Sequence, residues 1–247
     1  MIEMVNLSGG YGRKTAARDV SLAFRDGEVT AVIGPNGCGK STLLKLCAGQ
    51  LAPEAGTVRA DGRDLSGLRA REIARSVAYM PQSRPVPDMT VGTLALHGRF
   101  PWLGYPRVYG EADARAAEEA MSRTGILGKR GEMLARLSGG ERQKAYLAMT
   151  LAQGTPNLLL DEPATYLDVA VQLELAAIMR EAAGEGKCVA AVMHDVAAAA
   201  ELADRLAVMK DGRLLAAGAP EEVLGSGAVE EAFGIRLSRG ERLVFGR

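Results

Sequence analysis

The chain has 247 residues, of which 47% are hydrophobic and 24% are charged, a composition that is typical of globular proteins and excludes a disordered chain. Thirty Lys and Arg residues balance thirty Asp and Glu residues, so the net charge gives no indication of nucleic-acid binding. Cys38, Cys47 and Cys188 fit neither a disulfide framework nor a zinc site, and they favour a reducing compartment.

Three short apolar segments at the start of the chain, residues 2–7, 20–24 and 29–33, are predicted strands. "RDG" at residues 25–27 is expected to form a tight turn of the hairpin type between the second and third segments. A second Asp-Gly pair, at residues 61–62, predicts another hairpin. Antiparallel strands are therefore expected around the first parallel strand.

The segment "GPNGCGKS" at residues 34–41 matches the pattern G-x-x-x-x-G-K-[ST]. Its glycines let backbone N–H groups turn toward phosphate oxygens, and a helix starting near Lys40 adds the positive end of its dipole. Lys40 is placed to neutralise the β- and γ-phosphates, while the Ser41 hydroxyl can ligate Mg²⁺. The predicted nucleotide-binding residues of this loop are Gly34, Pro35, Asn36, Gly37, Cys38, Gly39, Lys40, Ser41 and Thr42.

The middle of the chain is predicted to be mostly helical. Residues 111–124 and 141–152 carry apolar side chains at helical spacing. We expect residues 87–150 to form a helical subdomain inserted into an α/β core built from residues 1–86 and 151–247, so that residues 1–247 make one domain.

The last third alternates apolar strands with helices. "NLLLD" and "CVAAVMH" are predicted strands, residues 169–183 and 196–206 are predicted helices, and "LAVMKDGRLLAAG" is a predicted hairpin. Apolar strands that alternate with amphipathic helices indicate a mainly parallel sheet with helices on its faces. The predicted fold class is α/β.

The predicted strand "NLLLD" ends in one carboxylate and is followed directly by a second. A buried strand delivers Asp161 to the carboxyl edge of the sheet, where it can hold Mg²⁺ through water. Glu162 can orient or deprotonate an attacking water, and this Asp-Glu pair favours hydrolysis over phosphoryl transfer to a second substrate. The alternative is that both residues only cap a following turn. No Asn-Lys-x-Asp sequence occurs, which disfavours a GTPase.

The segment "LSGGERQK" at residues 137–144 offers a second anion-binding helix start, with Ser138 as the N-cap and Gly139 and Gly140 leaving backbone N–H groups open. Alone it would be an ordinary capped helix. Together with "GPNGCGKS" and "LLLDEP" it resembles the signature motif of the ABC ATPases. The chain looks like a nucleotide-binding subunit of an ABC transporter. The resemblance implies a P-loop NTPase core with an antiparallel β subdomain and an inserted helical subdomain.

The resemblance also implies roles for single residues. Tyr11 matches the aromatic that stacks on adenine, and His194 matches the histidine that senses the γ-phosphate. Gln82 matches the glutamine between the metal site and the helical subdomain, and Asp168 matches the aspartate that touches the opposing subunit. The implied catalytic residues are Glu162, His194 and Lys40, and the implied Mg²⁺ ligands are Ser41, Gln82 and Asp161.

The family's arrangement implies that two copies of the chain pack head to tail. Ser138, Gly139, Gly140 and Glu141 of one copy would then close over the ATP held by the loop of the other. Closure would depend on the γ-phosphate, so hydrolysis would release it. We also expect Cys38, in the loop itself, to make ATP binding sensitive to thiol reagents.

"HGRFPWLGYPR" at residues 97–107 resembles ABC importers of iron–siderophore complexes, haem and cobalamin. The implied partners are transmembrane permease subunits, contacted from Gln82 to about Tyr109, and indirectly a substrate-binding protein. The implied location is the cytoplasmic face of the membrane. No run of the sequence reaches the roughly 18–20 apolar residues of a spanning helix, and no signal peptide is apparent.

Two other functions stay open at this point. One is an ABC ATPase that serves another transported solute. The other is a single-cassette ABC ATPase of iron–sulfur cluster assembly, which acts without a permease.

Overall fold

The computed structural model describes residues 1–12, 14–82, 85–165 and 167–236. Its larger sheet has six strands in the order β10-β9-β3-β8-β7-β6, all parallel except β10, which is antiparallel to β9. These strands are β3 (Val29–Ile33), β6 (Val77–Met80), β7 (Asn157–Asp161), β8 (Cys188–Val192), β9 (Arg205–Lys210) and β10 (Arg213–Gly218). The α/β class with a mainly parallel sheet is therefore confirmed.

A second, antiparallel sheet has the order β2-β1-β4-β5, with β1 (Ile2–Tyr11), β2 (Lys14–Phe24), β4 (Ala55–Ala60) and β5 (Arg63–Asp64). The hairpin at residues 61–62 is confirmed, since Ala60 pairs with Arg63 across it. β1 and β2 are longer than predicted, because the small residues Gly9 and Gly10 stay paired although they give no apolar alternation.

The turn at residues 25–27 was wrongly expected to join neighbouring strands. It carries the chain from β2 in the antiparallel sheet to β3 in the parallel sheet. The neighbours of β3 are β8 and β9, both parallel to it. All five residues of β3 are buried, so this strand needs cover on both faces, which the interior of a parallel sheet provides.

The helices are α1 (Lys40–Cys47), α2 (Ala70–Ser76), α3 (Val91–His97), α4 (Glu111–Arg123), α5 (Gly139–Ala152), α6 (Val169–Gly184), α7 (Val196–Leu202), α8 (Pro220–Gly225) and α9 (Ala228–Phe233). The sequence predicted α4, α5 and α6 within a few residues. The predicted helix 196–206 ends at Leu202 instead, because Arg205 already pairs with β3. β8 ends at Val192, two residues before His194.

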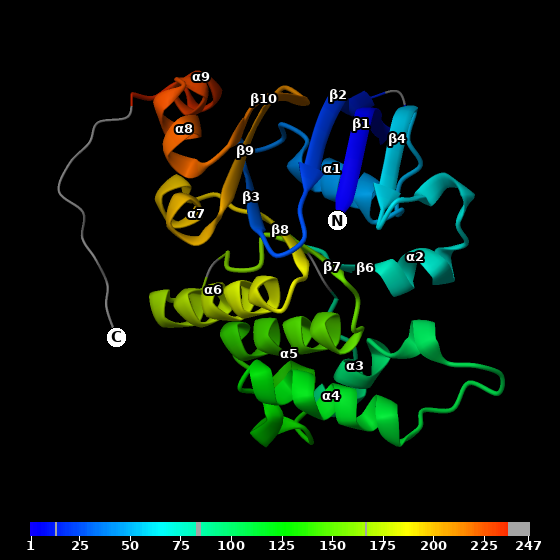
Figure 1. Cartoon of the computed structure of the whole chain (residues 1–247). Coiled ribbons are helices and arrows are strands. Elements are labelled where there is room, and N and C mark those ends of the chain that lie inside the picture. The colour runs from blue at the N-terminus through cyan, green and yellow to red at the C-terminus, as the bar shows by residue number, and fades with distance from the viewer. Residues whose placement is uncertain (13, 83–84, 166, 237–247) are drawn as a thin grey trace.

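Alternate side chains of the parallel strands enter two separate cores. Val32, Leu159 and Ala190 pack with α1 and the antiparallel sheet. Ala31 and Leu160 belong to the other cluster, which contains the residues of the long helices. Figure 1 shows the resulting arrangement, with α1 under the antiparallel sheet and α6 running between the parallel strands and α5. The parallel sheet is thus covered on both faces, as its uniformly buried strands require.

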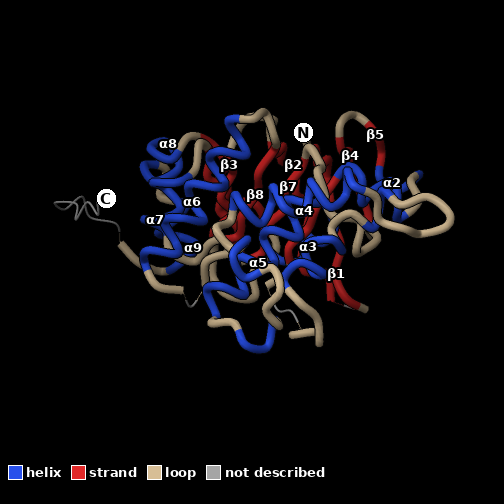
Figure 2. Tube along the Cα trace, turned by 90° about the horizontal axis from the view of Figure 1, so that it is seen from below, coloured by secondary structure: helices blue, strands red, loops and turns tan. Residues whose placement is uncertain are grey.

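Helices α3, α4 and α5 pack on one another below α6, and Figure 2 shows them together in front of the strands. They span residues 91–152, while the limits 87 and 150 of a helical subdomain stay a prediction. Among the described helices none combines the length and apolarity needed to cross a bilayer.

Candidate functional site

The glycine-rich loop connects β3 to α1 and is held closely by its neighbours. Gly34 has φ 151° and Gly39 has φ 107°. A Cβ atom on Gly34 would lie 2.2 Å from the carbonyl oxygen of Met209, and one on Gly39 would lie 2.1 Å from that of Ala16. Both positions therefore require glycine, and the loop keeps a fixed path with its backbone turned around a concave space.

Lys40 is the first residue of α1 and its side chain is only 5% exposed. Its ammonium group donates to the carbonyl oxygens of Gly34, at 2.7 Å, and Pro35, at 2.9 Å. A buried ammonium inside a glycine-rich loop at a helix N-terminus is the chemistry that suits phosphate oxygens. The loop therefore fits a phosphate chain.

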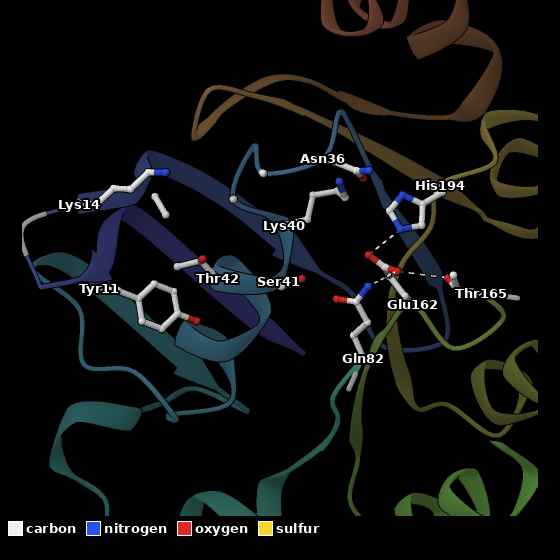
Figure 3. A pocket seen from close by; sticks show the side chains of 13 residues that line it. Tyr11, Lys14, Asn36, Lys40, Ser41, Thr42, Gln82, Glu162, Thr165 and His194 are labelled. Atoms are coloured by element: carbon white, nitrogen blue, oxygen red, sulfur yellow. Dashed lines mark hydrogen bonds and ion pairs between the residues drawn. The ribbon is translucent and has the colours of Figure 1, made fainter. Parts of the chain in front are cut away.

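The loop borders a cavity of about 740 Å³, shown in Figure 3. The lining residues are Tyr11, Lys14, Ala16, Asn36, Gly37, Gly39, Lys40, Ser41, Thr42, Gln82, Glu162, Thr165 and His194. Ten of these had been predicted as site residues. Gly34, Pro35, Cys38 and Asp161 had also been predicted and lie beside the cavity in the loop and at the end of β7.

Asp161 ends β7 and is 1% exposed. Its Oδ1 accepts a hydrogen bond from the Ser41 hydroxyl at 2.9 Å, and its Oδ2 accepts one from the Tyr79 hydroxyl at 3.0 Å. Burial raises the pKa of this carboxyl, and the two hydroxyl donors act in the opposite direction. The pair Ser41 and Asp161 offers the oxygen ligands that Mg²⁺ prefers.

The described residues contain no cluster of three or more His, Cys, Asp or Glu side chains that could hold a metal ion. A metal at Ser41 and Asp161 would therefore need further oxygen ligands, as Mg²⁺ usually takes from water and substrate phosphates. The donor set fits Mg²⁺ bound together with a nucleotide and does not fit a metal held by the protein alone.

Glu162 adopts φ 53°, an uncommon conformation for a residue with a side chain, and it is 8% exposed. Its Oε1 lies 2.5 Å from His194 Nε2. Its Oε2 accepts from Gln82 Nε2 at 2.6 Å and from the Thr165 hydroxyl at 3.2 Å. Figure 3 shows these three side chains converging on the one carboxylate.

The parallel strands explain how residues so distant in sequence meet. Gln82 follows β6, Glu162 follows β7 and His194 follows β8, and these three strands are neighbours in the sheet. Because parallel strands end at one edge, the residues just after them share that edge, where ligands bind in open α/β sheets.

The predicted signature residues lie elsewhere. Ser138 caps α5, accepting from Glu141 N at 3.3 Å, while Glu141 accepts from Ser138 N at 2.9 Å. Hydrogen bonds from Lys129 and from Ser138 lower the pKa of Glu141 to about 2. Asp168 caps α6, because its Oδ1 accepts a hydrogen bond from Val171 N at 3.0 Å. Ser138, Gly139, Gly140, Glu141 and Asp168 do not line the cavity of their own chain.

Some residues at the site had not been predicted. Lys14 pairs with Tyr11 across the β1–β2 turn, so a longer predicted hairpin would have found it. Thr165 follows Glu162 by three residues, a spacing that could have been read as a turn contact.

Cys38 is 5% exposed, and burial raises the pKa of its thiol. Both properties reduce thiolate reactivity and argue against the expected sensitivity to thiol reagents.

The chain is similar in sequence to known proteins. The model of the family described as ABC transporter matches residues 17–165. The ferric enterobactin transport ATP-binding protein FepC of Escherichia coli (strain K12) is 38% identical over 93% of this chain and 86% of its own length. The hemin import ATP-binding protein HmuV of Streptomyces coelicolor is 40% identical over 94% of this chain and 84% of its own length.

Solved structures show the same fold. A nucleotide-free ATP-binding cassette from an ABC transporter superposes with a TM-score of 0.84 and 22% identity, covering 94% of this chain and 98% of that one. A dimeric structure of a bacterial ABC transporter cassette has a TM-score of 0.79 and 25% identity, covering 89% of this chain and 99% of that one.

Proposed function

The chain belongs to the ABC transporter family as one of its ATP-binding ATPase subunits, and we propose that it powers uptake of an iron–siderophore complex or a related chelate, haem or cobalamin, through a partner permease. The observation that carries this proposal is the convergence of Lys40, Gln82 and Glu162 on one cavity beside the glycine-rich loop, where Ser41 bonds to Asp161. The named relatives are ATP-binding proteins of ferric enterobactin transport and hemin import, which supports the cargo class.

The residues of the site have different roles in ATP hydrolysis. The loop and Lys40 bind the phosphates, and Glu162 accepts a proton from the water whose oxygen attacks the γ-phosphorus. The bond from that phosphorus to the bridging β-phosphate oxygen breaks, which leaves ADP and phosphate. His194 Nε2, at 2.5 Å from Glu162 Oε1, orients the carboxylate, and His194 also lines the cavity, where it would sense the γ-phosphate.

Ser41, Gln82 and Asp161 are the proposed Mg²⁺ ligands, the aspartate through water. When bound, Mg²⁺ would neutralise charge on the β- and γ-phosphates. The hydrogen bond of 2.9 Å between the Ser41 hydroxyl and Asp161 keeps both oxygens beside the loop. Gln82 follows β6 and bonds to Glu162, so it connects this site to the part of the chain that leads to helices α3, α4 and α5 (the helical cluster).

A second copy of the chain is the proposed partner in the ATP site. Ser138, Gly139 and Gly140 start α5 outside the cavity of their own chain, which leaves an anion-binding helix terminus for another subunit. The similarity to a dimeric cassette supports a homodimer with two such composite sites.

The permease is proposed to contact the segment from Gln82 to about Tyr109 at the cytoplasmic face of the membrane; residues 83 and 84 of this segment lie outside the described residues. This segment exposes large apolar side chains beside α3. Tyr105 is fully exposed and Val108 is 70% exposed. Exposed apolar side chains gathered on one loop indicate a protein contact.

Uptake measured in proteoliposomes tests the proposal. The chain is purified from membranes with the proteins that travel with it, and the complex is reconstituted with ATP and Mg²⁺. We expect a multi-span permease in the complex and ATP-driven uptake of ferric siderophore, haem or cobalamin. Recovery of cluster-assembly proteins without a permease would instead assign the chain to iron–sulfur cluster assembly.

The matched control is the complex that carries Glu162→Gln. It should assemble with the same partners and bind ATP, yet show no uptake. Equal uptake by this control complex would contradict the coupling of transport to hydrolysis at this site.

A further inference from the structure

The phenol of Tyr11 is held by an ammonium group from the helix that follows the phosphate loop. Tyr11 ends β1, lines the cavity and is 50% exposed. Lys45 donates from Nζ to the Tyr11 hydroxyl oxygen at 3.0 Å, whereas its Nζ is 5.5 Å from the centre of the ring. The ammonium thus lies beyond the hydroxyl and does not cover the centre of the ring.

Lys45 is well placed to connect this ring with the phosphate side of the cavity. It lies one helical turn after Ser41 on α1, so the two side chains share a face of the helix. Its carbonyl oxygen accepts from Gln50 N at 2.9 Å, which fixes its backbone where the helix ends. Its positive charge also acts on the Asp161 carboxyl.

We propose that Lys45 is a positioning residue for base binding: its hydrogen bond fixes the Tyr11 ring so that the adenine stacks while the loop holds the phosphates. The inference rests on the proposed function, since it requires ATP in this cavity. A half-exposed ring that is already oriented loses less rotational freedom when a base stacks on it, and such preorganisation raises affinity.

A purely structural role makes a different prediction. The same hydrogen bond could do no more than hold β1 against α1, which pack together. Its loss would then lower the melting temperature and leave the affinity of the folded protein for every ligand unchanged. Ligand affinity therefore separates the two roles.

The test compares ATP with inorganic tripolyphosphate, a ligand that has the phosphates and lacks the base. Binding of each to the full chain is measured by calorimetry. For Lys45→Met we expect the Kd of ATP to rise about two- to ten-fold, the size expected for one exposed hydrogen bond. The Kd of tripolyphosphate should stay the same. Lys45→Arg, which retains a donor, should recover most of the ATP affinity.

The hydroxyl of Tyr11 supplies a second, independent variant. Tyr11→Phe keeps the ring and removes the acceptor, so it should weaken ATP binding as much as Lys45→Met does. The double variant should be no weaker than either single one, because both remove the same interaction. Additive losses would overturn the proposal.

Lys14→Met is the charge-matched control, since it removes one positive charge from a side chain that lines the cavity. Any effect of charge alone must appear for ATP and tripolyphosphate alike. If Lys45→Met weakens both ligands equally, or neither, Lys45 is not a positioning residue for the base. Failure of the unaltered chain to bind ATP would overturn the proposed function, which is a separate result.

Discussion

Glu162 Oε1 lies 2.5 Å from His194 Nε2, although the two residues are 32 positions apart and follow different strands. The other carboxylate oxygen accepts from Gln82 and Thr165. Because donors come from three segments, the carboxylate has one orientation despite the uncommon backbone conformation of its residue. The geometry suits a group that must meet one water molecule at a fixed place.

Replacement of Glu162 by Gln should separate binding from hydrolysis. The amide keeps the size of the side chain but is a poor proton acceptor, so we expect the ATPase rate to fall about 10²- to 10⁴-fold. ATP should still bind, and a dimer should accumulate with ATP because closure is no longer followed by hydrolysis. The rate is measured by phosphate release and the dimer by light scattering. A variant that hydrolyses ATP at the normal rate would exclude Glu162 as the base.

Gly39 tests whether the path of the phosphate loop depends on close backbone contact. In Gly39→Ala the new Cβ would lie 2.1 Å from the carbonyl oxygen of Ala16, so the loop must move. We expect ATP affinity, measured by calorimetry, to fall more than about ten-fold, with a stability loss of at least about 2 kcal/mol.

Gly27→Ala is the matched control. Gly27 also has a positive φ, 74°, but its Cβ would approach no atom closer than 3.8 Å. It should lose about 1 kcal/mol of stability and retain its ATP affinity. If both variants bound ATP equally well, contact with Ala16 would not shape the loop.

The sequence predicted those elements that carry their own local signal. β3 was predicted with its observed bounds because a run of four apolar residues and Thr30 stands between an Asp-Gly turn and a glycine-rich loop. β6 was missed because it begins at Val77, directly after α2 ends at Ser76, with no turn residue between them. α3 was missed because seven residues are too few for helical periodicity to be recognised.

The residues of the site also differ in whether the local sequence predicts them. Asp161 and Glu162 were predicted because they stand at the end of a strand and therefore lie at the edge of the sheet. The bonds of Tyr79 to Asp161 and of Lys45 to Tyr11 depend on how separate elements pack, and no spacing in the sequence encodes them. A sequence pattern therefore indicates the reacting residues more readily than it indicates the residues that hold them in place.

Asp161 should make stability depend on pH in a defined direction. Burial raises the pKa of its carboxyl in the folded chain above 3.8, so the folded state binds this proton more tightly than the unfolded state. The stabilising contribution of the protonated Asp161 carboxyl to the unfolding free energy is then lost as pH rises from about 3.8 through the raised pKa. Above the raised pKa the unfolding free energy no longer changes with pH through this group. Asp161→Asn does not titrate, so it should gain stability relative to the unaltered chain across this window.

Urea denaturation without Mg²⁺ or nucleotide, repeated at several pH values, measures this difference. Asp113→Asn is a control of opposite sign, because the Gly110 backbone N–H and Arg99 lower the pKa of that carboxyl. It should lose relative stability as pH rises toward 3.8 from below. The same pH trend in both variants would contradict the assignment.

The ion pair of Arg99 with Asp113 should stabilise the helical cluster. Nε of Arg99 lies 3.1 Å from Asp113 Oδ1, and the two side chains are only 17% and 16% exposed. Nη1 also donates to the carbonyl oxygens of Ala152, at 3.0 Å, and Gln153, at 3.3 Å, where α5 ends. Arg99→Met leaves a mostly buried carboxylate and two carbonyl groups without this donor, so we expect a loss of about 1–3 kcal/mol in urea denaturation.

Arg115→Met removes a cation of the same helix-rich region from an exposed pair. Nη1 of Arg115 lies 3.4 Å from Oε2 of Glu111, which stands one turn earlier on α4. These side chains are 70% and 93% exposed. Such a pair contributes about 0.5 kcal/mol or less, because water and salt screen it. The prediction is therefore a ranking: Arg99→Met loses more stability than Arg115→Met, and the difference persists at high salt because the buried pair is poorly screened. Equal losses would show that Arg99 acts only as a surface charge.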